Sequence, residues 1–470
     1  LLILAAAMAA GWRTLNGDGD LPRHLVTGQV IVETRSIPRH DIFSYYYQGR
    51  TYVAHEWVAD VIYYLFYKLL GLGGVVLLTA ILIATTFFIL YSAMVAEHNE
   101  RFVTMGLLAW GVVCSYWHWV ARPHLFTMLF LALWLVLVDR IARGQAVKLW
   151  LLPVLMLVWS NTHSAFIAGF LVLVAYMAGW VWDYVVERPA ADPAVLKRLS
   201  FMFGLSFLAS LVNPFGIETW GMMTSYVNNT ALMSIINDTK PPVFTDPQVR
   251  SEFLLMLLSL LLLGMQRSGI RAGRAFLLVG TTALAMTSGR NIHLYAVVAP
   301  FVLAGPAIEV VGSGIKRRFA AATASVESQL RGVAWPVMTA LACVALLAVG
   351  KIGKDYYFEP ARFPVDAVTW LEDNPQSGRM FNDFDWGGYV VWRLWPEQAD
   401  FIDGKSDLSG EATRDYLTVQ DLGPGWQGIL DRYDVRWAII PTDSALSSRL
   451  IQDGWAVLYQ DPTAVILRRN

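Results

Sequence analysis

Charged residues and cysteines are both scarce in this sequence. Asp, Glu, Lys and Arg make up 16% of the 470 residues, and hydrophobic residues make up 56%, whereas a soluble protein carries about 25% charged residues. The formal net charge of -1 gives no indication of a nucleic-acid partner. Cys114 and Cys343 both lie in apolar stretches, so we interpret them as buried thiols rather than a disulfide or a metal-binding pair. The composition indicates a polytopic membrane protein with a more polar tail.

Nucleotide-binding motifs are also missing. The sequence has no G-x-G-x-x-G after a predicted strand and no P-loop, so a nucleotide cofactor is unsupported. It has no internal repeat and no low-complexity segment either. The informative features are therefore the apolar stretches and the polar loops between them.

About eleven apolar stretches are candidate membrane spans. A spanning helix needs about 20 mostly apolar residues, and fewer where water or protein covers its ends. The candidates are 1–11, 73–95, 102–120, 125–141, 148–160, 164–184, 201–213, 252–266, 273–287, 292–312 and 333–350. The first begins without Met, so we expect it to be the end of a membrane helix whose start is missing. A cleaved signal peptide is less expected, because no polar mature domain follows.

The segment 55–70 is apolar in part but does not fit a span. It is short and carries Glu56, Asp60 and Lys68 with aromatic residues between them. An amphipathic helix that lies at the membrane interface fits this composition better. Residues 12–71 then form one long first loop, and the number of spans is odd.

The basic residues predict the orientation of the chain. With the N-terminus inside, the inner loops hold most of the Lys and Arg residues, as the positive-inside rule requires. The later outer loops hold little beyond Arg122, Lys240, Arg250 and Arg290. The first outer loop is basic in places, but long loops cross the membrane largely regardless of charge. The C-terminal tail is therefore expected outside the cytoplasm.

In this orientation the unusual polar residues all fall on the outer side. Charge near a bilayer is costly and by default suggests function, and the first loop carries Asp18, Asp20, His24, Asp41, His55, Glu56 and Asp60. Polar turns follow four other spans, at Arg122-Pro123-His124, Asn161-Thr162-His163, Asn213-Pro214-Phe215-Gly216 and Arg290-Asn291-Ile292-His293. Five separate segments thus converge on one face, as an active site at the outer membrane boundary would require.

The tail is predicted to form a small α/β domain, so the chain divides into residues 1–353 in the membrane and 354–470 outside it. Helical spacing alternates with short apolar runs that are typical of strands. The expected helices are 364–373, 411–420 and 444–451, and the expected strands are 379–381, 400–402, 437–440, 456–459 and 464–467. Four tail acids could bind a sugar or a cation, although turn and capping roles are the simpler interpretation. These acids are Asp383, Asp385, Asp403 and Asp407.

Several motifs resemble those of one known family. In the first loop these are Asp20-Leu21-Pro22-Arg23-His24, Gly28, Ile37-Pro38, Asp41-Ile42-Phe43-Ser44 and His55-Glu56-Trp57. With the four outer turns, and with 382–389 and 401–404 of the tail, they resemble bacterial GT-C-type integral membrane glycosyltransferases over nearly the whole chain. The Asp-Glu pair that opens this loop in the protein mannosyltransferase and aminoarabinose transferase branches is missing. A close substrate analogy with those branches is therefore not implied.

The resemblance implies a fold, an activity and partners. GT-C enzymes have a first outer loop with a catalytic Asp and interfacial helices, and they pass sugar from a polyprenyl phosphate or diphosphate to an acceptor outside the cytoplasm. We therefore expect an α-helical polytopic GT-C-like protein of the bacterial inner membrane, whose C-terminal α/β domain is extracytoplasmic. The expected partners are a lipid-linked sugar donor, membrane lipids, and a glycan, lipid or protein acceptor. No cofactor is certain, and a divalent cation stays open because no ligand spacing specifies a metal.

The same resemblance assigns the catalytic roles. Asp20 is the expected general base, and Asp18 is the alternative because Asp18-Gly19-Asp20 leaves the register ambiguous. His24 lies four residues after Asp20, on the same face if this segment is helical. Glu56 could position an acceptor or bind a cation. The simpler alternatives are a helix N-cap for Asp20 and a first-turn acid for Glu56.

Substrate contacts are expected from the basic residues of the outer turns. Arg and His can hold a phosphate, and Arg does so with two parallel hydrogen bonds. The expected binding residues are His55, Arg122, His124, His163, Arg290 and His293. An arginine at the end of a span can also simply extend its charge to the interface, and His163 could be an ordinary bundle histidine.

Two other functions stay open at this point. A transporter or flippase of lipid-linked glycans should carry ionisable or broken-helix features near the membrane midplane. Mid-span segments such as 76–90 and 253–263 are apolar instead, which favours chemistry at the surface. The chain could also be a non-catalytic subunit of a larger assembly.

Overall fold

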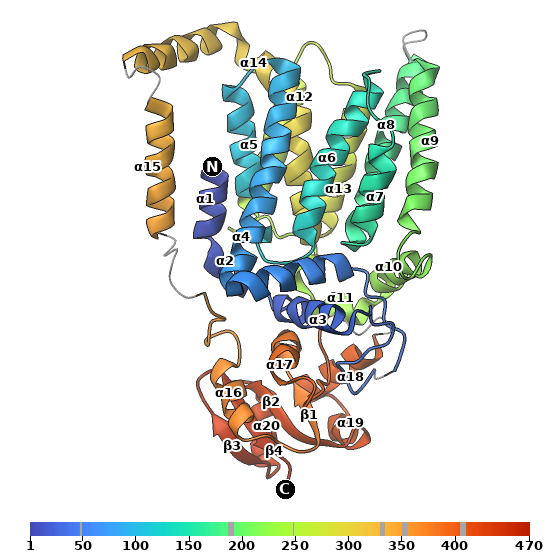
Figure 1. Cartoon of the computed structure of the whole chain (residues 1–470), viewed down its shortest axis with the longest axis vertical. Coiled ribbons are helices and arrows are strands. Elements are labelled where there is room, and N and C mark those ends of the chain that lie inside the picture. The colour runs from blue at the N-terminus through green and yellow to red at the C-terminus, as the bar shows by residue number, and fades with distance from the viewer. Residues whose placement is uncertain (48, 187–191, 248, 330–333, 350–355, 405–409) are drawn as a thin grey trace.

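The chain forms a bundle of helices with a smaller α/β part at one end (Figure 1). The computed structural model describes residues 1–470 apart from 48, 187–191, 248, 330–333, 350–355 and 405–409. The bundle helices are α1 (Leu2–Ala9), α4 (Trp57–His98), α5 (Phe102–Ser115), α6 (His124–Ala142), α7 (Leu151–Ser160), α8 (Ile167–Val186), α9 (Pro193–Ser210), α12 (Arg250–Met265), α13 (Ala272–Thr287), α14 (Ile292–Gln329) and α15 (Ala334–Val349).

A helix stands at each stretch that the sequence marks as a candidate span. Among the described residues, four helical segments are long and apolar enough to cross a membrane, namely Trp57–His98, His124–Ala142, Ser164–Val186 and Gly289–Gly312. Bundle side chains such as Phe88, Leu260 and Val279 are 67–69% exposed, which suits contact with lipid and not with water. The chain is therefore an integral membrane protein.

The first outer loop forms helices that lie across the end of the bundle. α4 changes direction at Gly71, whose φ of 61° and ψ of -155° suit only glycine. Residues 57–70 of α4 and the helix α3 (Leu21–Thr34) both run across this end, between the bundle and the tail (Figure 1). This arrangement agrees with the expectation that residues 55–70 do not span the membrane.

A group of buried charges joins three helices at the opposite end of the bundle. Arg274 of α13 donates to Asp139 of α6 at 2.8 Å and to Glu97 of α4 at 2.6 Å. Tyr176 of α8 also donates to Asp139, at 2.8 Å. These ionic contacts lie near helix ends, so they fasten the bundle at the boundary that faces away from the first loop. These contacts were not predicted from the sequence.

The tail folds around a four-stranded sheet with the order β1-β2-β4-β3. β1 (Arg379–Asn382) is parallel to β2 (Val435–Pro441), whereas β4 (Ala464–Arg468) is antiparallel to β2 and to β3 (Ala456–Gln460). The expected helices are present as α16 (Val365–Asp373), α18 (Glu411–Gln420) and α20 (Ala445–Gln452), and the side chain of Ser444 caps the last of them. α17 (Gly387–Leu394) and α19 (Trp426–Arg432) were not predicted.

The expectation of a strand at 400–402 is wrong. The backbone N–H of Asp400 donates to the carbonyl of Phe43 at 3.1 Å, and that of Tyr45 donates to the carbonyl of Asp400 at 3.2 Å. Phe401 packs against the first-loop ring of Tyr46, with ring centres 5.7 Å apart. The apolar run is buried as a strand would be, but its backbone pairs with the first loop, and it is bonded to the sheet through the side chain of Asn382 in β1.

The hydrophobic core is continuous between the bundle and the tail. One cluster of buried apolar residues includes Leu25 of α3, Tyr63 of α4, Phe358, Met380 of β1 and Tyr389 of α17. α17 packs directly on α3. The tail is therefore docked on the helices of the first loop, which places tail residues next to Asp20.

Candidate functional site

Arg122 connects the two acids that open the first loop. Its Nη2 lies 2.8 Å from Asp20 Oδ2, and its Nη1 lies 2.8 Å from Asp18 Oδ2. The other oxygen of Asp18 accepts the backbone N–H of Asp20 at 2.7 Å. This local turn fixes the position of the Asp18 carboxylate relative to Asp20. Side chains at this point are 22–26% exposed, so they are accessible but partly shielded from water.

The surroundings of Arg122 come from four parts of the chain. Asp20 is the N-cap residue of α3, and Arg122 lies in the turn before α6. That turn is fixed by a hydrogen bond from the backbone N–H of Ala121 to the carbonyl of Thr14 at 2.9 Å and by one from Tyr63 Oη to the Arg122 carbonyl at 3.1 Å. Helices that are far apart in sequence thus determine where the guanidinium lies.

A second arginine and a third acid complete this group. Arg290 Nη2 lies 3.0 Å from Asp238 Oδ1, and Asp238 Oδ2 lies 3.5 Å from Arg122 Nη1. We call Asp18, Asp20, Arg122, Asp238 and Arg290 the carboxylate–arginine group. Asp238 was missed in the sequence analysis, because a lone acid in a long outer loop carries no distinctive pattern.

Burial and neighbouring charges shift the acids of this group in opposite directions. Burial raises the pKa of Asp18 to about 6, and repulsion from Asp20 adds to the effect while Arg122 opposes it. Burial would also raise the pKa of Asp238, but Arg290 and Arg122 outweigh it and hold that pKa below its usual value. Asp18 is thus the acid whose charge changes close to neutral pH.

Glu56 forms a second group with two histidines. Glu56 Oε1 lies 3.6 Å from His163 Nε2 and 3.8 Å from His55 Nε2. The Nδ1 atom of His163 accepts the backbone N–H of Ala165 and contacts Thr127 Oγ1 at 2.8 Å. Since Nδ1 accepts, the ring proton is on Nε2 and faces the carboxylate of Glu56.

Electrostatics links the two groups. Burial lowers the pKa of His163 to about 3, Glu56 opposes this shift, and the positive charges of Arg122 and Arg290 reinforce it. His163 is therefore neutral at ordinary pH and can pass a hydrogen bond without adding charge.

Three histidines form a third group beside Arg122 and Arg290. The rings of His124 and His293 are 5.3 Å apart, and each also contacts the ring of His118, at 5.9 and 5.1 Å. His124 Nε2 donates to the His118 carbonyl at 2.7 Å. The structure thus brings together the predicted His124 and His293. It also adds His118, which was not predicted because it lies among aromatic residues at the end of the candidate span 102–120.

His24 pairs with Asp60 of α4. Its Nδ1 lies 2.5 Å from Asp60 Oδ1, and both side chains are 1% exposed. The pair is buried between α3 and the first part of α4. This position is suited to holding the two interfacial helices together.

The tail acids have different surroundings. Asp383 accepts the N–H of Asp385 at 3.0 Å and the hydroxyl of Tyr416 at 3.3 Å, which is a turn and capping role. Burial raises the pKa of Asp385 to about 6, with added repulsion from Asp383 and Asp20. Asp403 pairs with Arg23. Asp407 lies outside the described residues.

No group of three or more His, Cys, Asp or Glu side chains in the described part of the chain has a geometry that could hold a metal ion. The acids nearest to the predicted base face arginines instead. The divalent cation that the sequence leaves open therefore has no assigned ligands among the described residues.

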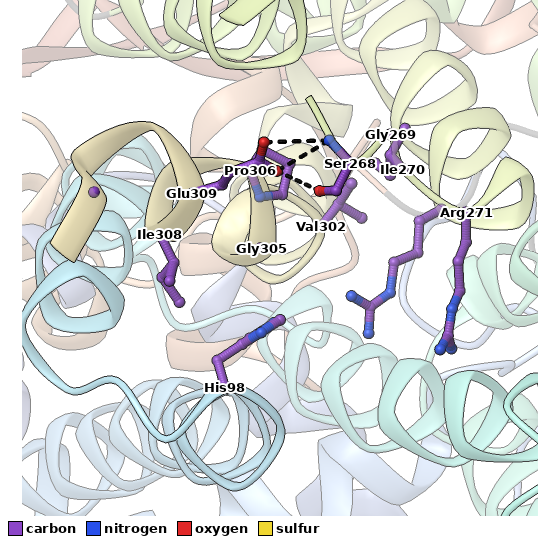
Figure 2. A pocket seen from close by; sticks show the side chains of 12 residues that line it. His98, Ser268, Gly269, Ile270, Arg271, Val302, Gly305, Pro306, Ile308 and Glu309 are labelled. Carbon is purple, nitrogen blue, oxygen red and sulfur yellow. Dashed lines mark hydrogen bonds between the residues drawn. The ribbon is translucent and has the colours of Figure 1, made fainter. Parts of the chain in front are cut away.

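A large cavity lies at the other end of the bundle. Its volume is about 620 Å³, and it is lined by His98, Arg271, Arg274 and the loop and helix residues around Ser268 and Glu309 (Figure 2). The backbone N–H and the hydroxyl of Ser268 both donate hydrogen bonds to the Glu309 carboxylate. None of the predicted site residues lines this cavity, so it is separate from the carboxylate–arginine group.

Comparison with known proteins gives matches in structure only. No protein-family model matches the chain, and no curated protein matches it. The oligosaccharyltransferase of Archaeoglobus fulgidus in the apo form matches with a TM-score of 0.60 and 12% identity, over 94% of this chain and 69% of that chain. ArnT from Cupriavidus metallidurans matches in the apo state, with a TM-score of 0.56 and 14% identity over 99% and 97% of the two chains. ArnT bound to undecaprenyl phosphate matches with a TM-score of 0.53 and 14% identity over 99% and 96%.

These matches extend over nearly the whole chain, although so few residues are identical. At that level of identity the likeness concerns the fold and not the chemistry. The bundle, the interfacial first loop and the α/β tail of this chain therefore have the fold of the GT-C glycosyltransferases.

Proposed function

We propose that this chain is a glycosyltransferase that moves a sugar from a polyprenyl-phosphate-type donor to an acceptor outside the cytoplasm. The observation that carries the proposal is the carboxylate–arginine group, which combines a partly exposed acid at the start of α3 with two arginines. The fold adds support, because one neighbour is ArnT bound to undecaprenyl phosphate and another is AglB of Archaeoglobus fulgidus in complex with an inhibitory peptide and a dolichol-phosphate.

Asp20 acts as the general base in this proposal. Its carboxylate takes the proton of the acceptor hydroxyl, and the acceptor oxygen forms a bond with the anomeric carbon of the donor sugar. The bond between that carbon and the phosphate oxygen breaks, and the electron pair leaves with the lipid phosphate. Asp18 is the alternative base, because both acids contact Arg122.

The arginines and histidines offset the charge of the leaving phosphate. Arg122 and Arg290 each carry a fixed positive charge and can donate two hydrogen bonds to phosphate oxygens. Because Arg122 faces Asp18 and Asp20, a phosphate bound there would share this guanidinium with the acids. His124 and His293 lie beside it and supply neutral hydrogen bonds. Preorganised donors of this kind stabilise charge that develops in the transition state.

The Glu56 group is suited to holding the acceptor. His163 presents its Nε2 proton to Glu56, so an acceptor hydroxyl could replace either partner. His55 adds a second ring on the same carboxylate. His24 is placed to support α3 through Asp60. No step passes through a metal ion in this scheme.

The proposal also places the protein in the bacterial inner membrane, with the tail outside the cytoplasm. The transporter alternative receives little support from the described buried charges. Asp139 and Arg274 lie near the ends of their helices, and not midway along them. A transport pathway would need such residues near the midplane.

The substitution Asp20→Asn tests the proposed base. We expect it to lower the amount of glycosylated product in the producing cell by about 100-fold or more, because general-base catalysis contributes about 10²–10⁴-fold. Glycolipid and glycan profiling of the membrane fraction measures this change. Asp18→Asn should have a smaller effect, and Asp373→Asn, which changes an exposed acid of α16, should have none. An unchanged profile for Asp20→Asn, in a folded and normally expressed protein, would rule out Asp20 as the base.

A further inference from the structure

The tail meets the first loop directly at Asp20. A Cβ atom built on Gly404 would lie 2.8 Å from Asp20 Oδ1, which is closer than side chains pack in folded proteins. Arg122 Nη2 lies 2.8 Å from the other carboxylate oxygen, Oδ2. The Asp20 carboxylate is therefore held between an arginine of the bundle and a glycine of the tail.

The residue before this glycine forms a buried ion pair with α3. Arg23 Nε donates to Asp403 Oδ2 at 2.5 Å, and the two side chains are 1% and 0% exposed. Arg23 Nη1 also donates to Thr27 Oγ1 at 2.6 Å, and its guanidinium carbon lies 3.8 Å from the centre of the Phe43 ring. Because Arg23 is in the first turn of α3, this pair fixes the helix start that carries Asp20.

The two backbones are also in close contact beside this pair. A Cβ on Gly388 would lie 3.0 Å from the carbonyl oxygen of Gly19, and a Cβ on Gly19 would overlap the carbonyl oxygen of Asp385. Within the tail, a Cβ on Gly387 would overlap the carbonyl oxygen of Ile402, the residue before Asp403. Gly388 and Gly19 therefore let the tail lie directly on the residues before α3.

An ion pair this deeply buried contributes little to net stability, since removing both charges from water offsets their attraction. Its effect is rather to select one arrangement, because the attraction that offsets the cost of burial is present only when Arg23 and Asp403 meet. The buried pair and the close glycine contacts act on the same short stretch, residues 19–23, which carries Asp20.

We propose that Asp403 and Gly404 are positioning residues for Asp20, so that the tail forms part of the active site. This inference rests on the proposed function, in which Asp20 is the base. Asp403 acts through Arg23, and Gly404 acts by direct contact with the Asp20 carboxylate. Neither residue takes part in making or breaking bonds.

Gly404→Ala tests this inference with one added methyl group. The matched control is Gly428→Ala in α19 of the same tail, where a Cβ would meet nothing within 4 Å. Both full-length variants are compared with wild type for the glycosylated product that depends on Asp20, for thermal unfolding and for binding of undecaprenyl phosphate as a probe. We expect Gly404→Ala to lose at least tenfold in product while the unfolding midpoint and probe binding stay unchanged. The control should match wild type in product and in probe binding, and its unfolding midpoint should be equal or slightly higher, because alanine favours a helix more than glycine does.

A second variant keeps the inference testable if Gly404→Ala does not fold. Asp403→Asn keeps the shape of the side chain but removes its charge, so hydrogen–deuterium exchange in the first turn of α3 should become at least several times faster. Gly428→Ala should leave this exchange unchanged.

Three results would overturn the inference. Product at the wild-type level in Gly404→Ala would mean that contact with Asp20 has no consequence. A parallel loss of probe binding would place Gly404 in the donor site instead. Unchanged exchange of α3 in Asp403→Asn would mean that the ion pair does not hold the helix start. Failure of the proposed function is distinguishable, because Asp20→Asn itself would then leave the product unchanged.

Discussion

At the scale of single residues, one arginine determines how two acids can behave. Arg122 contacts both Asp18 and Asp20, and Asp18 also accepts the backbone N–H of Asp20. Loss of the Asp18 charge therefore weakens its contact with the Arg122 guanidinium and its hydrogen bond from the backbone N–H of Asp20, the proposed base. The pKa of Asp18 is raised to about 6 by burial and by repulsion from Asp20, so this change falls in an accessible pH range.

The pH dependence of turnover should reflect Asp18. Its raised pKa means that the carboxylate is neutral below about pH 6 and charged above it, so the rate should rise between about pH 5 and pH 7. The rise should be at least about tenfold, because a hydrogen bond to a charged group contributes about 1.5–3 kcal/mol and about 1.4 kcal/mol corresponds to a factor of ten in rate. Asp18→Asn mimics the neutral acid and should give a low rate without this step. A step with the same midpoint in the variant would contradict the assignment, and Asp373→Asn serves as the control that keeps it.

At the scale of elements, α3 and the first part of α4 act as one platform. α3 carries Asp20 at its start, and α4 begins directly after Glu56. The buried contact between His24 and Asp60 joins the two helices. Gly28 allows their close approach, because a Cβ there would overlap the carbonyl oxygen of Asp60. The distance between these helices therefore sets the distance between the base and the Glu56 group.

Gly28→Ala should separate these two helices. Glycine to alanine in a helix normally stabilises it by up to about 1 kcal/mol, but overpacking at this contact should cost about 1–3 kcal/mol. Gly106→Ala in α5 is the matched control, since a Cβ there would meet nothing within 4 Å. Thermal unfolding in detergent should show a lower midpoint for Gly28→Ala only. Equal midpoints for both variants would mean that the helices are not closely packed at Gly28.

At the scale of the whole molecule, the two ends of the bundle carry different chemistry. The end near the tail holds the carboxylate–arginine group, and the opposite end holds the Asp139–Arg274 pair and the cavity of about 620 Å³. The two ends of the bundle are therefore chemically distinct, so the molecule has a defined orientation to predict in the membrane. The basic inner loops predict that the tail end faces outward.

Cysteine labelling can test this direction. After Cys114 and Cys343 are replaced by Ala, a single cysteine is introduced at the exposed Ser448 of α20 or at the exposed Gln145 after α6. We expect a membrane-impermeant maleimide to label Ser448→Cys in intact spheroplasts, and Gln145→Cys only after permeabilisation. The reverse pattern would contradict the predicted orientation.

Much of the architecture could be predicted because the signals are local. Runs of apolar residues predicted the bundle helices, the charges of 55–70 predicted the interfacial segment, and helical spacing predicted α16, α18 and α20. The strand expected at 400–402 failed because local hydrophobicity indicates burial and not the partner. Asp238 and His118 were missed because each is a single polar residue without a pattern around it.

Local patterns are enough to predict the apolar helices and the side on which the polar turns are expected, because hydropathy and basic residues act over one segment at a time. Which side chains meet depends instead on how the helices and the tail pack. Asp18 and Arg122 are 104 residues apart, and Arg23 and Asp403 are 380 residues apart. Such pairs form because helix packing and tail docking bring distant turns together, and no local pattern encodes that geometry.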